Sequence, residues 1–151
     1  MNTIDLRAGT LCCPLPAALD AMGERWSFLI LRGAFCGLAN FEEFQSTLGI
    51  ARNILSNRLT RLVASGIMAR TRDTQDRRKI AYRLTEKGLA LLPVLIALRQ
   101  WGECWGNGGP SNPVLVDRRD RQPVRSIAVQ AQDGRELCCA DLEWIERSQV
   151  S

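Results

Sequence analysis

The chain contains no histidine, and this absence removes the usual ways of activating a nucleophile. Without histidine there is no Cys-His pair and no Ser-His-Asp triad. The glycines form no GxxxxGK[ST] loop that would cradle phosphates, and the acidic residues are scattered rather than clustered. The sequence therefore predicts that the protein is not an enzyme, and a cysteine-dependent enzyme is the weakest alternative.

Spaced pairs of zinc ligands are also missing. A structural zinc site needs four Cys or His ligands, which commonly come as spaced pairs. Here Cys138 and Cys139 are adjacent, and residues 114–131 contain no cysteine. The sequence therefore predicts neither a metal nor a cofactor.

Long hydrophobic runs are the third absence. The longest, residues 89–98, contains Pro93 and has 10 residues, whereas a membrane-spanning helix needs about 20. No cationic and then apolar signal peptide opens the chain. We therefore expect no membrane partner and a cytoplasmic location, in which the six cysteines are read first as thiols.

The apolar residues that are present suffice for one ordinary domain and a small appendage. Of the 151 residues, 46% are hydrophobic and 24% are charged, which is the balance of a globular protein. The net charge of +4 is unevenly placed, because residues 50–88 hold ten Arg and Lys against three Asp and Glu. This basic middle favours a polyanion as partner, although a solvated basic face without a partner has the same composition.

Hydrophobic periodicity predicts a mainly α fold with one β-hairpin, an α+β arrangement. Asn40 stands three residues before Glu43, which is the spacing of a capping box, and Gly49 supplies the stop of that helix. Pro93 is tolerated in the last helix only if that helix kinks or starts late. The predicted helices are a short one ending at Met22, then 25–36, 41–48, 51–65 and a long one after Thr85, with hairpin strands at 67–72 and 79–84.

The composition changes after Trp105, where Gly, Asn and Pro dominate residues 106–113. Beyond this linker we expect strands at 114–116 and 127–129, a hairpin turn at 132–135, and a short helix or strand at 141–147. The chain is thus predicted to consist of an N-terminal arm at residues 1–12, a helical domain at 13–106, and a linker with a small β-rich extension at 107–151.

The predicted helix at residues 51–65 has two different faces. Its apolar residues fall in one half of the circumference and its polar residues in the other. An α-helix fits the DNA major groove, where Arg pairs with guanine and Asn with adenine. Helix, tight turn, amphipathic helix and basic hairpin is the order of a winged helix-turn-helix. We expect base contacts from Arg52, Asn53, Ser56 and Asn57, and phosphate contacts from Arg58, Arg61, Arg72, Arg77, Arg78 and Lys79.

Three stretches resemble the HxlR family of bacterial transcriptional regulators, which are relatives of the MarR group. They are "CPLPAALDAMGERWSFLILRGAF", "NFEEFQSTLGIARNILSNRLTRLVASGI" and "YRLTEKGLALLPVLIALRQWG". The resemblance implies a homodimer, built through the terminal helices, that binds a palindromic operator in double-stranded DNA, with repression as the default. This chain departs from the family pattern in a wing tip without prolines and in a tail without spaced cysteine pairs.

The residues themselves also favour a dimer. Residues 89–98 are apolar on all sides, which a small monomer could hardly cover. Pairing with a twin would bury this surface and would place two recognition helices about one DNA turn apart. The alternative is a helix buried wholly within its own chain.

Some HxlR-like proteins resemble redox or electrophile sensors that use the Cys of the Cys-Pro motif, which here is Cys13. A helix N-terminus favours the reactive thiolate, and Cys12 is a conceivable resolving thiol although neighbouring cysteines pair poorly. The alternative role of Cys13 is simple packing. We expect Cys36 and Cys104 to be buried structural residues. The candidate effector is an oxidant or a small molecule, and the rival to DNA binding is a winged-helix protein-interaction module.

Overall fold

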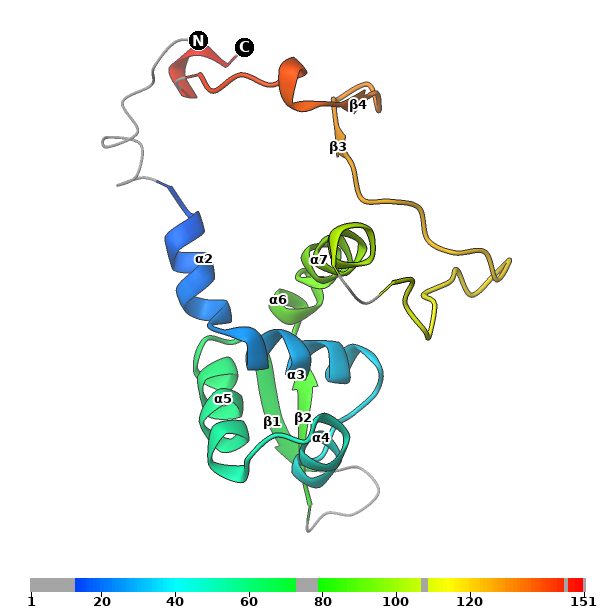
Figure 1. The fold of residues 1–151 in the computed structure, drawn as a ribbon. Coiled ribbons are helices and arrows are strands. Elements are labelled where there is room, and N and C mark those ends of the chain that lie inside the picture. Colours follow the sequence, from blue (N-terminus) through cyan, green and yellow to red (C-terminus); the bar gives the residue numbers. More distant parts are fainter. Residues whose placement is uncertain (1–12, 73–78, 107–108, 146, 151) are drawn as a thin grey trace. The chain divides into compact units, whose positions relative to one another are not determined.

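The computed structural model describes residues 13–72, 79–106, 109–145 and 147–150 (Figure 1). Two compact units make up the chain, residues 15–99 and the combination of residues 1–14 with 100–151. The first unit carries the predicted winged helix-turn-helix, and the predicted fold class is confirmed. The unit boundary falls at Gln100, inside the last long helix, whereas the sequence pattern breaks near residue 106.

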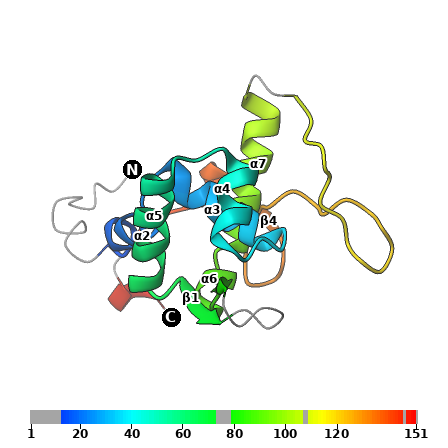
Figure 2. The same cartoon turned by 90° about the horizontal axis from the view of Figure 1, so that it is seen from below.

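The core of the first unit is built around α3 (Arg25–Phe35), which follows α2 (Leu15–Met22). Ile30 and Leu31 are fully buried, and both α4 (Phe41–Leu48) and α5 (Arg52–Ala64) pack against α3 (Figure 2). Gly33 permits this close approach, because a Cβ there would lie 2.9 Å from Leu38 Cδ1 and 3.2 Å from a ring carbon of Phe44.

The capping predictions for α4 are confirmed. The Asn40 amide donates to Glu43 Oε2 at 3.0 Å, so the first turn of the helix has the partner that a capping box provides. Gly49 ends the helix in the left-handed conformation at φ 61°, which costs glycine little. The turn between α4 and α5 therefore has a defined geometry.

The wing is an antiparallel hairpin of β1 (Met68–Arg72) and β2 (Ile80–Leu84), as predicted. Met68 pairs with Leu84 at its base and Arg72 with Ile80 at its far end. An isolated β-bridge pairs Ala81 with Asn40, and the Tyr82 amide donates to the Ala39 carbonyl at 2.8 Å. The hairpin is thereby joined to the chain just before α4.

The last helical stretch is divided into α6 (Glu86–Leu89) and α7 (Leu92–Trp105). Pro93 lies in the first turn of α7, where its missing N–H costs nothing, so the late start is the alternative that is realised. No residue of α7 is buried. Within the part of the chain that the structure describes, no helix has the length and apolarity needed to cross a membrane.

The backbone of the second unit is organised by turns more than by strands. The hairpin turn at residues 132–135 is confirmed, flanked by β3 (Val129–Gln130) and β4 (Glu136–Leu137). The strands expected at 114–116 and 127–129 are mostly wrong, because within these two ranges only Val116, in an isolated bridge, and Val129, in β3, have β-type pairing. The described residues 141–145 and 147 belong to no α-helix or strand, and 3₁₀ turns stand at η1 (Cys139–Asp141) and η2 (Arg147–Gln149).

Two expectations about cysteines are wrong. Cys36 and Cys104 are both exposed in the structure. Cys36 follows the last turn of α3, beyond the residues that face the core, and Cys104 lies near the end of α7. The apolar residues that surround these cysteines in the sequence therefore do not indicate that the thiols are buried.

Candidate nucleic-acid interface

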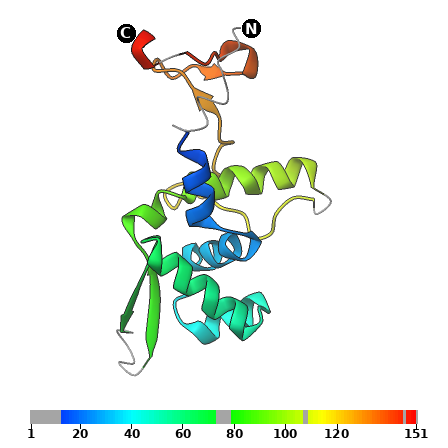
Figure 3. The ribbon, with the colours of Figure 1, turned by 90° about the vertical axis from the view of Figure 1, so that its left-hand side faces the viewer.

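The helix α5 separates its apolar and polar residues as its sequence predicts. Leu55, Leu59 and Leu62 are buried against α3 and α4, while Ile54 and Val63 are partly buried. The opposite face stays accessible beside the hairpin (Figure 3). The four residues expected to contact bases are all exposed, namely Arg52, Asn53, Ser56 and Asn57.

The start of α5 is fixed from two sides. Ile50, in the turn before the helix, is 2% exposed and anchors the backbone in the core. The Arg52 guanidinium lies over the Phe41 ring of α4, 4.9 Å from its centroid. This cation–π contact orients a side chain that still reaches solvent, so Arg52 is partly ordered before any ligand arrives.

Asn53 and Asn57 lie one helical turn apart on the exposed face. They line, together with Ile54 and Arg58, a shallow hollow of about 290 Å³. Each amide offers both a donor and an acceptor, which is the pattern that a base edge requires. The hollow gives these groups room for a partner that approaches along the helix.

Arg58 does not lie where the sequence analysis expects it. Its side chain is 13% exposed, and Nη2 forms an ion pair with Glu24 Oε1 at 2.7 Å. Position 58 falls between the two faces of α5, so the guanidinium turns toward the start of α3 instead of the solvent. In this arrangement the Arg58 guanidinium is paired with a carboxylate.

We call the exposed face of α5 that carries Arg52, Asn53, Ser56 and Asn57 the recognition face. Cations of the wing and of the end of α5 lie around it. Arg61 is exposed on α5, and Arg72 and Lys79 are exposed on either side of the hairpin tip. Arg77 and Arg78 lie outside the described residues. Arg70 is an exposed cation that the sequence analysis missed. The alternation of Arg70 with Arg72 along β1 was the available signal, because alternate residues of a strand share a face.

The Leu-Thr-x-x-Gly stretch explains how the wing is held against α5. The Thr85 hydroxyl contacts the Gly66 carbonyl at 2.6 Å and accepts from the Gly88 amide at 3.2 Å. A Cβ at Gly88 would collide with the Ile67 carbonyl oxygen, so only glycine allows this approach. Lys87 Nζ donates to the Ser65 carbonyl at 2.7 Å. The start of α6 therefore clamps the junction between α5 and β1.

The candidate redox cysteine stands at an accessible place. Cys13 is exposed two residues before α2, and Cys12 lies outside the described residues. Cys138 and Cys139 are exposed in the second unit. Among the described residues, no group of three His, Cys, Asp or Glu side chains is arranged to hold a metal ion.

A sequence profile of the HxlR-like helix-turn-helix family matches residues 21–109. An uncharacterized HTH-type transcriptional regulator of Mycobacterium tuberculosis, Rv3095, is 44% identical over 86 residues, which are 57% of this chain. They are 54% of the relative, so the chain spans about half the length of the curated relatives it matches. These matches are to regulators and not to enzymes.

Solved structures agree with the sequence matches. PA1607, described as a candidate transcription factor, superposes with a TM-score of 0.82 at 44% identity and covers 89% of this chain and 94% of its own. The redox regulator HypR in its oxidized form superposes with a TM-score of 0.55 at 31% identity, covering 61% of this chain and 96% of its own. The likeness to PA1607 extends into residues beyond the winged unit, whereas the likeness to HypR covers a smaller share of the chain.

Proposed function

Because the chain belongs to the HxlR-like helix-turn-helix family, we propose that it is a transcriptional regulator that binds specific sequences of double-stranded DNA in the cytoplasm. The observation that carries the proposal is the exposed face of α5. Four side chains able to pair with bases stand there above a buried row of leucines. A helix so mounted can enter a major groove without disturbing the core.

The residues divide into two roles. Arg52, Asn53, Ser56 and Asn57 make base contacts, since they occupy the N-terminal half of α5. Arg61, Arg72 and Lys79 neutralise phosphates, together with Arg70 and with Arg77 and Arg78 of the wing tip. Glutamates and aspartates are few in this stretch, which keeps the local potential positive.

The protein acts as a homodimer on a palindromic operator. Support comes from the exposed apolar residues of α2 and α7, including Leu19, Leu98 and Trp101 at 51%, 50% and 64% exposure. Surfaces of this kind mark interfaces in small proteins. A two-fold axis through these helices would present two copies of α5 to successive turns of DNA.

Oxidation of Cys13 is the signal that we propose to control DNA occupancy, with a small molecule as the other candidate effector. Two facts support the proposal: Cys13 is exposed just before α2, and the chain is similar to HypR, which is described as a redox regulator. A change at the dimer helices would alter the spacing of the two recognition helices. Release of DNA would then relieve repression.

Selection of bound DNA from a random pool tests the central proposal. We expect a palindrome to be enriched, and we expect Arg52→Ala with Asn57→Ala to remove the preference while the dimer persists in analytical ultracentrifugation. The matched control is Arg118→Ala with Asn112→Ala, which changes the same residue types in the second unit. An unchanged preference in the first variant would contradict the assignment of α5 as the reader.

Gel-shift assays under reducing and oxidising conditions test the signal. We expect oxidant to release DNA from the wild-type protein but not from the Cys13→Ser variant. Cys36→Ser is the matched control, since Cys36 is also exposed. If Cys13→Ser still releases DNA on oxidation, another thiol carries the response and Cys13 has no part in it. If oxidant releases DNA from neither protein, a small-molecule effector becomes the explanation.

A further inference from the structure

The ion pair between Glu24 and Arg58 joins two parts of the winged unit that are distant in sequence. Glu24 is 66% exposed and occupies the turn between α2 and α3, whereas Arg58 is 13% exposed on α5. The pair is therefore anchored on one side by a nearly buried guanidinium. Arg58 also lines the hollow beside Asn53 and Asn57, so the contact that orients Arg58 also fixes one wall of the recognition face.

The turn that carries Glu24 has little freedom. Gly23 adopts a left-handed conformation at φ 77°, and a Cβ there would lie 3.2 Å from the Oγ of Ser27, which is itself buried. The Gly23 amide closes α2 by donating to the Leu19 carbonyl at 2.8 Å. The backbone that carries Glu24 is thus held at a defined place, and α5 contacts both of the helices that this turn connects.

We propose that Glu24 is a positioning residue for DNA recognition, which holds α5 in register through Arg58 and keeps that guanidinium away from phosphates. The proposal rests on the proposed function, because its readout is sequence preference in DNA. The carboxylate touches no base. It acts by fixing the side chain that lies next to the amides of Asn53 and Asn57.

The proposed loss of positioning and the change in net charge alter DNA affinity in opposite directions. Removing a carboxylate makes the protein more positive, which by itself strengthens binding to any DNA. Losing a positioning contact weakens binding to the operator alone. The ratio of operator affinity to random-sequence affinity therefore separates the two effects.

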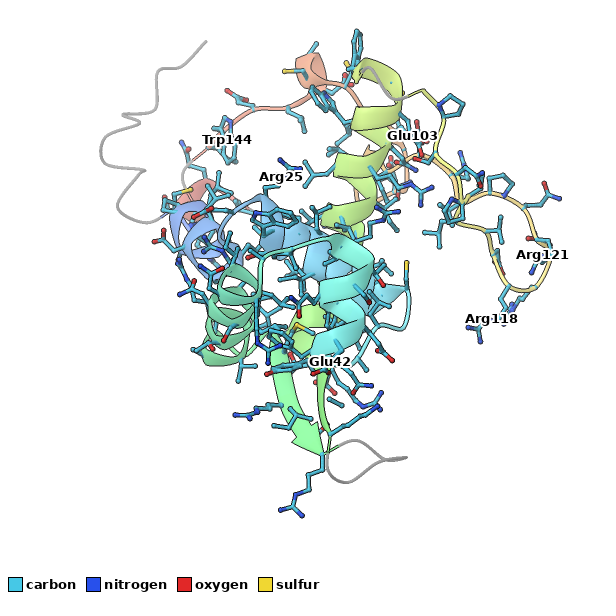
Figure 4. All side chains as sticks on the ribbon, turned by 60° about the horizontal axis from the view of Figure 1, so that its bottom comes forward. Arg25, Glu42, Glu103, Arg118, Arg121 and Trp144 are labelled. Atoms are coloured by element: carbon cyan, nitrogen blue, oxygen red, sulfur yellow. The ribbon has the colours of Figure 1, made fainter. Side chains whose placement is uncertain are left out.

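The main test compares Glu24→Ala with Glu24→Gln, which have the same net charge. Glutamine retains an oxygen that can accept from Arg58 Nη2, whereas alanine does not. We expect the operator-to-random ratio to fall about tenfold in Glu24→Ala, the size of one lost base contact. Glu24→Gln should recover most of that ratio. Glu42→Ala, on an exposed residue of α4, is the control for charge (Figure 4).

Arg58→Met supplies the second arm, since methionine keeps an unbranched apolar stem in the same space. We expect the same fall in ratio and no change in the dependence of binding on salt. A phosphate ligand would instead lower that slope by about one. In the double variant Glu24→Ala with Arg58→Met, the loss should not exceed that of either single change, because both remove one contact.

Three results would overturn the proposal: equal behaviour of Glu24→Ala and Glu24→Gln, a reduced salt slope in Arg58→Met, or additive losses in the double variant. Circular dichroism and thermal melting show which variants are folded, and Glu24→Gln with Arg58→Met still decide the matter if Glu24→Ala is not. Failure of the proposed function looks different, because the wild-type protein would then select no DNA sequence at all.

Discussion

The two units differ in the burial of their apolar side chains, which are packed in a core in residues 15–99 and mostly exposed in residues 100–151. The first unit buries a continuous set that includes Phe44, Leu55 and Leu59. In the second unit no described residue from Gly109 to Val150 is buried, and Trp144 is 87% exposed. Similar residue types thus give a packed core only where helices of sufficient length present an apolar face to one another.

The two units also differ in charge. Residues 50–88 carry ten Arg and Lys against three Asp and Glu, whereas residues 107–151 carry six Arg against seven Asp and Glu. The first distribution attracts a polyanion, and the second is close to neutral. Arg125 and Arg135 of the second unit are further offset by ion pairs with Glu136 and Asp133. DNA contact is therefore expected to come from the winged unit.

The largest expected difference concerns packing. Leu59→Ala should lower the free energy of unfolding by about 2 to 5 kcal/mol, because it leaves a cavity in the core. The matched change Leu142→Ala, at a residue 50% exposed, should cost about 0.5 kcal/mol or less. Urea unfolding at fixed protein concentration measures both. An equal cost at Leu142 would mean that the second unit is covered by another surface in solution.

A smaller difference in stability is expected between alanine substitutions at two helical glycines. Gly88→Ala should destabilise by about 1 to 3 kcal/mol, because the new methyl group meets the Ile67 carbonyl oxygen. Gly102→Ala, where nothing lies within 4 Å of the new Cβ, should stabilise α7 by up to about 1 kcal/mol. Thermal melting gives the two signs directly. Because α7 is also a proposed dimer helix, stabilisation by Gly102→Ala would place Gly102 outside the contact between copies, and destabilisation would place it inside.

Much of the winged unit could be predicted because local signals agree with one another. Residues close in sequence determine the capping box at Asn40, the end of α4 at Gly49 and the two faces of α5. The position of Arg58 could not be predicted in this way. Its partner Glu24 lies 34 residues away, and only the packing of α3 against α5 brings them together.

The second unit was harder to predict for a different reason. The short apolar runs at 114–116 and 127–129 are rich in valine and isoleucine and have strand propensity, but a strand needs a neighbour to supply hydrogen bonds. Here much of that bonding comes from side chains. Gln100 donates to the Arg125 carbonyl at 3.0 Å and accepts from the Ile127 amide at 2.8 Å, which replaces a neighbouring strand by one amide group.

The smallest expected effects are changes in the salt dependence of DNA binding when single arginines of the two units are removed. Arg72→Ala should lower the slope of log affinity against log salt by about 0.9, as the loss of one phosphate contact does. Arg121→Ala should leave the slope unchanged, although Arg121 is also exposed, on a loop of the second unit (Figure 4). Titration with random-sequence DNA at several salt concentrations measures both slopes. A reduced slope in Arg121→Ala would show that exposure, and not the basic environment around α5, decides which arginines meet DNA, and the functional division between the two units would then fail.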